Sequence, residues 1–148
     1  MLANAVMNIC EWQRGEYTIS TDPARLNLDL IVDFLQQLSY WARNRSRAEI
    51  ERSIQHSLVF GLYHDGQQVG FARLVTDYTI FVYVCDVFVL ESERGQGLGQ
   101  WLMRTMQTHP ELQGMRRWVL TTQDAHGMYA HVGFVPLKNP DRWMQIGV

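Results

Sequence analysis

The chain has 148 residues, of which 47% are hydrophobic and 19% charged. These proportions are typical of one globular domain and argue against a disordered chain. Thirteen Lys and Arg against fifteen Asp and Glu give a formal charge of −2, which does not favour nucleic acid or an anionic membrane as a partner. No apolar run approaches the roughly 20 residues that span a bilayer, and the first ten residues lack the regions of a signal peptide. Two cysteines without a CxxC spacing argue against a disulfide scaffold or zinc site. We therefore expect one cytoplasmic domain over 1–148 with no metal.

The first half of the chain predicts a strand, two helices and a hairpin. Residues 17–21 alternate as a strand does and end at an Asp-Pro turn. From Leu28, apolar residues recur at the helical spacing, namely Ile31, Phe34, Leu35 and Leu38. A second, more polar helix is predicted from Ser46, a capping residue with Glu49 three positions on, to about His56. Strands at 58–63 and 68–75 follow, joined by an Asp-Gly turn that is typical of a hairpin.

The second half alternates strands and helices. The run 80–90 is the most apolar in the chain, with Asp86 as its single charged residue, and it predicts a central strand covered on both faces. A helix from Leu98 to about Pro110, a strand at 118–121 and a short helix at 124–131 come next. Strands are also expected at 134–135 and 143–146. The order indicates a mixed α/β sheet of six to seven strands flanked by about four helices.

A glycine-rich loop joins the apolar strand to the helix that follows it. Residues 94–99 read Arg-Gly-Gln-Gly-Leu-Gly, and three glycines in five positions let the backbone approach a ligand closely. A helix that begins there offers unpaired N–H groups and the positive end of its dipole, which favours a phosphate or pyrophosphate. The alternative is a simple turn. The loop lacks the Gly-Lys-Ser/Thr of a Walker A motif and the spacing of a dinucleotide fingerprint.

Two blocks together resemble the GNAT superfamily of N-acetyltransferases. Arg94-x-x-Gly97-x-Gly99 looks like its acyl-CoA-binding motif, and the block from Ala125 through Tyr129 to Gly133-Phe134 is similar to its second motif. The order of elements also matches from residue 17 onward. The resemblance implies a GNAT fold of the α/β (α+β) class with a splayed central strand pair, and acetyl-CoA as the acyl donor.

The resemblance also implies where acetyl-CoA binds. Main-chain amides of the loop and the helix start would hold the pyrophosphate, and Arg94 would order the loop. Free main-chain groups on the splayed strand, at Val87, Phe88 and Val89, would pair with the pantetheine arm. The implied loop residues are Arg94, Gly95, Gln96, Gly97, Leu98, Gly99 and Gln100. The chain departs from the family at Glu91, where many members carry Pro, and at Thr122, where many carry Asn.

Acetyl transfer to an amine needs a proton donor for the leaving thiolate, a donor to the developing oxyanion and an acceptor for the amine proton. By resemblance, Tyr129 is the general acid and the N–H of Val89 the oxyanion donor. Tyr129 could instead be an aromatic packing residue. Asp86 is the candidate base, although a structural aspartate or a chain of waters in place of a base fits equally well.

The acceptor is open at this stage. The family sets acceptor specificity mainly between its first two helices, where this chain has aromatic residues and arginines at 40–45. These suit an aromatic or anionic acceptor, or are simply core and solvated residues. We expect direct transfer in a ternary complex to a primary amine of a small molecule or protein, because Cys85 sits inside a strand. The alternative is a non-catalytic acyl-CoA-binding module of the same fold. Edge strands make a homodimer possible.

Overall fold

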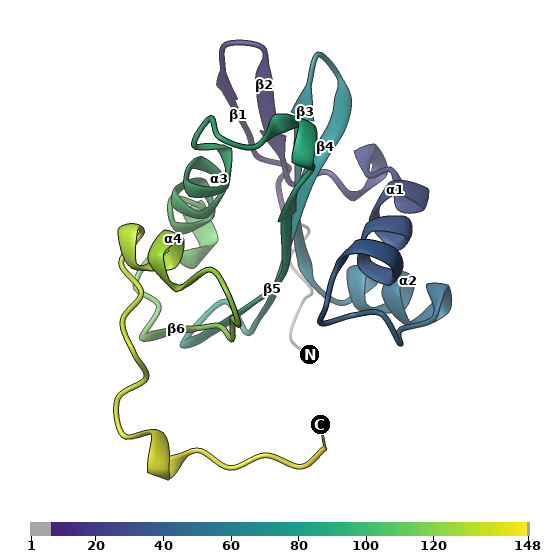
Figure 1. Ribbon diagram of the computed structural model, residues 1–148. Helices are drawn as coiled ribbons and strands as arrows, with labels where there is room; N and C mark the ends of the chain where they lie inside the picture. The colour runs from purple at the N-terminus through teal and green to yellow at the C-terminus, as the bar shows by residue number, and fades with distance from the viewer. Residues whose placement is uncertain (1–6, 148) are drawn as a thin grey trace, which may run out of the picture.

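Six strands form one mixed sheet in the computed structural model, which describes residues 7–147. Their spatial order is the chain order, β1-β2-β3-β4-β5-β6 (Figure 1). All neighbours are antiparallel except β5 and β6, which are parallel. The mixed sheet with a splayed strand pair is confirmed. The strands are β1 Glu11–Arg14, β2 Tyr17–Ser20, β3 Leu58–His64, β4 Gln67–Thr76, β5 Phe81–Val89 and β6 Arg117–Val119.

Four α-helices cover the two faces of the sheet. On one face lie α1 (Leu28–Asp33), which continues as a π-helical turn over Phe34–Leu38, and α2 (Arg47–Gln55). The other face carries α3 (Leu98–Gln107) and α4 (His126–His131) (Figure 1). The predicted capping box of α2 is present, since Ser46 and Glu49 satisfy each other's backbone N–H groups. None of the described helices is long and apolar enough to cross a membrane.

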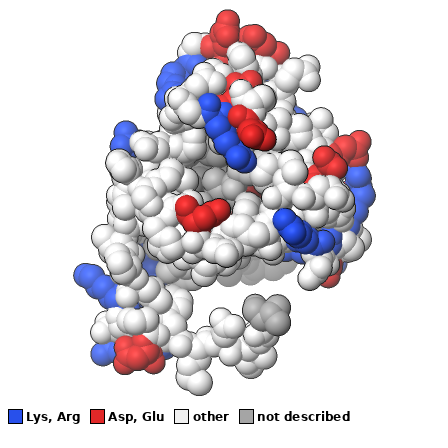
Figure 2. All heavy atoms as spheres, in the orientation of Figure 1, with Lys and Arg blue, Asp and Glu red and all other residues white. Residues whose placement is uncertain are grey.

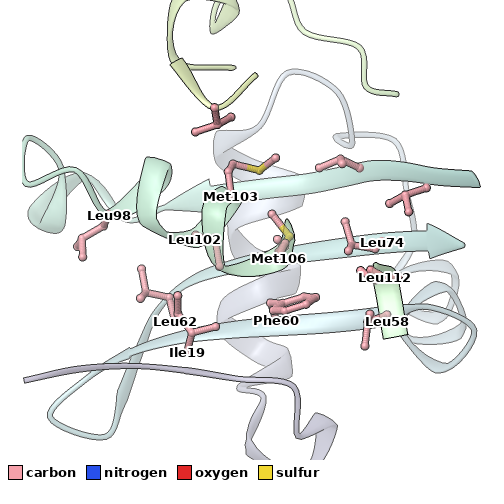
Figure 3. Packing of buried hydrophobic residues seen from close by; sticks show 14 of the residues in the cluster. Ile19, Leu58, Phe60, Leu62, Leu74, Leu98, Leu102, Met103, Met106 and Leu112 are labelled. Atoms are coloured by element: carbon pink, nitrogen blue, oxygen red, sulfur yellow. The ribbon is translucent and has the colours of Figure 1, made fainter. Parts of the chain in front are cut away.

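Each face has its own hydrophobic core. The α3 face buries Phe60, Leu62 and Leu74 of the sheet against Leu102 and Met106 of the helix (Figure 3). The α1–α2 face buries a second cluster in which the rings of Phe34 and Phe88 stack with centroids 3.9 Å apart. The sheet therefore lies between two packed helical layers. Beyond Tyr83, where the pairing with β6 ends, the outer edge of β5 is exposed between these layers.

Several element predictions are wrong. β1 was not predicted, because its sequence Glu-Trp-Gln-Arg has too few apolar residues to alternate, and it exists through pairing with β2. Residues 134–135 and 143–146 do not form strands, and neither segment pairs with a strand of the described sheet. Leu38 is 64% exposed, because the π-helical turn widens the helix and takes this side chain off the buried stripe.

The bulge in β5 decides which main-chain groups face the opening. Two residues of β5, Asp86 and Val87, lie opposite Ala72 of β4, and Asp86 has a φ of +52°. The extra residue exchanges the faces, so Val84 packs on the α3 side whereas Phe88 packs on the α1–α2 side. Along β5 buried side chains alternate with partly buried ones, so the strand is not covered evenly on both faces, as the sequence suggested.

Candidate active site

The outer edge of β5 is free beyond its first three residues. β6 pairs only with Phe81–Tyr83, so the parallel strands separate from there on. Leu90 donates its N–H to Val69 of β4, at 2.8 Å, and a Cβ added to Gly70 of β4 would meet the carbonyl oxygen of Phe88. Since main-chain groups alternate in direction along a strand, those of Val87 and Val89 point away from β4, into the opening.

Phe88 differs from its two neighbours. Its main chain faces β4, and its side chain is buried against Phe34 and Phe71. Phe88 was predicted to hydrogen-bond the ligand through its main chain, together with Val87 and Val89. The geometry argues against that role for Phe88. The main chain of Val87 and Val89 is directed into the opening, and a ligand contact there stays a prediction.

The loop after β5 presents a row of free amides. Gly95 and Gly97 have φ values of +83° and +74°, in the left-handed region that favours glycine. Within residues 7–147, the N–H groups of Gly95, Gln96 and Gly97 make no recorded hydrogen bond. α3 begins at Leu98 without a side-chain cap, so its first N–H groups are also unpaired. A Cβ at Gly95, Gly97 or Gly99 would meet no atom within 4 Å, so the loop is uncrowded at its three glycines.

Side chains anchor the loop where it leaves β5. Arg94 donates from Nε to the carbonyl oxygen of Val89, at 3.1 Å, which supports the predicted ordering role. The preceding residue, Glu93, accepts a hydrogen bond from the Tyr17 hydroxyl (2.6 Å) and pairs with Nδ1 of His64 (2.9 Å). The loop is thereby fixed to β2 and β3.

Two cavities meet over the free edge of β5. One, of about 570 Å³, is lined by the loop residues and by Val87 and Val89. The other, of about 680 Å³, lies beside the middle of β5 and the segment that follows β6. Figure 2 shows this face of the molecule hollowed between the helical layers, with acidic and basic side chains at the rim. The residues that line both cavities are Tyr40, Trp41, Val87, Asp124, Ala125 and Tyr129.

Tyr129 lies where the cavities meet. It projects from α4, and its ring makes an edge contact with Phe134 at a centroid distance of 5.8 Å. Burial raises the pKa of Tyr129 to about 12, and the neighbouring Tyr40 and Asp124 contribute. The phenol therefore stays protonated at neutral pH, the state that a proton donor requires.

Asp86 is buried but fully engaged. It accepts hydrogen bonds from Nε of Arg73 (2.9 Å), from Nη1 of Arg45 (2.8 and 3.0 Å) and from the indole N–H of Trp41 (2.9 Å). These four contacts occupy both carboxylate oxygens, and two of the donors carry positive charge. The arrangement argues against Asp86 as the general base and favours the alternative of a structural aspartate.

Sequence reasoning missed the role of a second carboxylate. Asp124 precedes α4, is exposed, and lines both cavities beside Tyr129. Its carboxylate makes no recorded contact within the described part of the chain, so it is open to an amine. Across the opening, the Tyr40 hydroxyl accepts a hydrogen bond from the N–H of Gln123, at 2.8 Å. This contact joins the loop after α1 to the loop before α4. No short motif marks either residue, since they meet only in the fold.

Among residues 7–147, one group of side chains brings possible metal-ligand atoms together. Glu16, His64 and Asp65 place such atoms within 4.8 Å of one another. Two of these residues are exposed, and His64 is already hydrogen-bonded to Glu16 and Glu93. Hydrogen bonding accounts for the group without an ion.

Comparison with known proteins agrees with this geometry. The model of the acetyltransferase (GNAT) family matches residues 8–134. A protein of Gibberella zeae is 32% identical, with 76% of this chain and 75% of that protein covered. A GNAT-family crystal structure from Xanthomonas campestris is 45% identical, with a TM-score of 0.86 over 89% of this chain and 93% of that chain. Both are described as putative acetyltransferases. A GNAT-family acetyltransferase of Streptococcus pneumoniae is 25% identical, with a TM-score of 0.65 and coverage of 95% and 96%. The chain belongs to the GNAT acetyltransferase family.

The contact between His64 and Glu93 predicts a pH-dependent stability. Hydrogen bonds to Glu93 and then Glu16 raise the pKa of His64 above 6.5. Its contribution is therefore complete below pH 6.5 and is lost as the pH rises through the raised value. Hydrogen bonds from Tyr17 and then His64 lower the pKa of Glu93, so its contribution is lost only as the pH falls through that lowered value. The pair stabilises the loop most between these limits.

We expect His64→Gln to reduce the thermal midpoint of unfolding near pH 6 and to change it little near pH 9, where neutral His64 contributes least. The measurement is thermal unfolding at a series of pH values. His56→Gln is the control, because His56 is exposed at the end of α2. An equal effect of His64→Gln at both pH values would show that the charge on His64 does not stabilise the fold.

Proposed function

We propose that the protein transfers the acetyl group of acetyl-CoA to a primary amine, directly and within a ternary complex. One observation carries the proposal: Tyr129 and the free edge of β5 meet at the junction of two cavities, one beside an amide-rich loop and one beside polar side chains. A donor can enter from the loop side and an acceptor from the other. The shared residues would surround the reacting atoms.

The cavity beside the loop fits the CoA part of the donor. The unpaired amides of 95–97 and of the α3 start lie on a loop that lines this cavity, and the positive end of the helix dipole adds to their attraction for a pyrophosphate. Arg94 uses its Nε to hold the loop, which leaves its terminal nitrogens available for phosphate. An extended pantetheine arm would pair with the main chain of Val87 as a further strand does, since the carbonyl oxygen of Val89 already accepts from Arg94 and its N–H is left for the thioester.

Acetyl-CoA supplies a thioester, whose C–S bond breaks as the new C–N bond forms to the amine. The N–H of Val89, which points into the opening, would donate to the carbonyl oxygen as negative charge develops there. Tyr129 would donate its phenolic proton to the sulfur that leaves. The amine gives up a proton to water, and water returns a proton to the Tyr129 phenolate, so the products are the amide and the free thiol. Val89 and Tyr129 both line the cavity beside the loop.

Direct transfer is favoured over a covalent acyl-enzyme. Cys85 also lines the cavity on the acceptor side, but burial raises the pKa of its thiol to about 11. The thiolate is the nucleophilic form of cysteine, and it is scarce at neutral pH at this position. The amine itself must therefore attack the thioester. Asp124 is the carboxylate best placed to attract the ammonium form of the amine into the junction.

Gly97→Glu tests the donor site. A carboxylate at the start of α3 would repel phosphate and fill the space in front of the amides, so we expect acetyl-CoA binding to be lost in titration calorimetry. Gly114→Glu is the matched control, because Gly114 has a φ of +77° and equally open surroundings outside this loop. It should carry the same backbone strain and keep full affinity. Unchanged affinity of Gly97→Glu would place the donor site elsewhere.

Tyr129→Phe tests the proton donor. The ring contact with Phe134 is retained and only the hydroxyl is removed, so we expect kcat to fall by about 10²–10⁴-fold with little change in acetyl-CoA affinity. Thiol release with an accepted amine gives kcat, and calorimetry gives the affinity. Tyr78→Phe is the control, since Tyr78 lines neither of the two cavities.

The same assays separate an enzyme from a binding module. If the wild-type protein binds acetyl-CoA but acetylates no amine, the non-catalytic alternative is correct. If Tyr129→Phe retains full kcat, the family's acid role does not apply to this chain.

A further inference from the structure

In the cavity of about 680 Å³, which we call the acceptor cavity, two arginines share one carboxylate. Arg45 and Arg73 both pair with Asp86, and the other carboxylate that lines the cavity, Asp124, makes an ion pair with neither of them in the described part of the chain. Arg73 is nearly buried, and it also donates from Nη1 to Ser57. The side chain of Arg45 is 35% exposed and uses only its Nη1 on Asp86. Its Nε and Nη2 donate to no residue in the described range, although the side chain lines the cavity.

Charge is also ordered along the acceptor path. Asp124 lines both cavities and lies beside Tyr129, whereas Arg45 lines only the acceptor cavity. The acidic group is therefore at the junction and the free guanidinium nitrogens lie away from it. A cation would be drawn to the junction and an anion to Arg45. A guanidinium with free N–H groups is suited to bind a carboxylate.

We propose that the acceptor is an aminocarboxylate, such as a free amino acid. Its ammonium group lies toward Asp124 at the junction, and its carboxylate is bound by Nε and Nη2 of Arg45. This inference rests on the proposed acetyl transfer and names the substrate class of the same site. Asp86 and Trp41 are positioning residues here, since they hold the Arg45 side chain and the aromatic wall in place.

Matched pairs of amines test the proposal. Each amino acid is compared with the amine that lacks its carboxylate: phenylalanine with phenethylamine, methionine with 3-methylthiopropylamine, and lysine with cadaverine. Thiol release gives kcat and KM for each. We expect at least one amino acid to have a higher kcat/KM than its partner by about tenfold or more, because a carboxylate bound by arginine makes charge-assisted hydrogen bonds.

Variants of Arg45 then assign the preference. Arg45→Gln should raise KM for the amino acid about tenfold more than for its partner, with kcat less affected. Arg45→Lys keeps the charge that Asp86 needs and should give a smaller loss. Arg43→Gln is the control, because Arg43 lies on the same loop, bonds to the carbonyl oxygen of Ser39 and lines neither cavity.

Three results would overturn the substrate class without affecting acetyl transfer. One is an equal preference for both members of every pair, and another is an equal effect of Arg45→Gln on both. The third is a preference for a peptide with a free N-terminus, which has no carboxylate beside its amine. If no amine is acetylated although acetyl-CoA binds, the proposed function itself fails.

Discussion

The carboxylate of Asp86 lies inside the fold and is held by donors from two layers, Arg73 of β4 and both Arg45 and Trp41 from the loop between α1 and α2. An unpaired buried carboxylate would be very costly, so these contacts must form together. They fix the bulge of β5 at a left-handed residue, a conformation that Asp tolerates better than most residues. The bulge in turn sets which main-chain groups of β5 face the opening. The ion pairs of Asp86 therefore connect the free edge of β5 with Arg45 and Trp41, which line the neighbouring cavity.

This arrangement explains why a buried acid need not be the base. A general base needs a lone pair directed at its substrate, and the oxygens of Asp86 are already directed at two guanidinium groups and an indole. Its removal would affect the acceptor cavity through Arg45 and the donor edge through the bulge. Loss of activity on substituting Asp86 would thus have a structural cause, and the mutation by itself could not identify a base.

Much of the fold follows from local sequence patterns. The capping box at Ser46, the Asp-Gly hairpin and the apolar face of α3 are all short-range signals, and each is present in the structure. The glycine loop could also be located, because left-handed backbone favours glycine and the three closely spaced glycines are visible in the sequence. β1 could not be predicted, since its polar residues form a strand only through a neighbour.

The candidate site shows the same difference between local and long-range signals. Contiguous motifs identify Tyr129 and the loop as candidates, whereas the roles proposed for Asp124 and Arg45 depend on contacts between distant segments. The direction of the Phe88 main chain depends on the register between β4 and β5, which one extra residue changes. Residues 143–146 have the sequence pattern of a strand but form none in the structure. The pattern gives only a preference for extended backbone, and a strand also needs a neighbouring strand to pair with.

Different contacts hold the loop, the edge of β5 and Tyr129 in place. The loop is fixed by Glu93 and Arg94, the edge of β5 by the bulge, and Tyr129 by its contact with Phe134 on a short helix. The bridge from Tyr40 to the N–H of Gln123 is a single hydrogen bond between two loops, so it is the weakest connection around the junction. Tyr40 and Tyr129 line the same two cavities. Opening of that one bond would therefore widen the path of the proposed acceptor while the loop and Tyr129 stay in place.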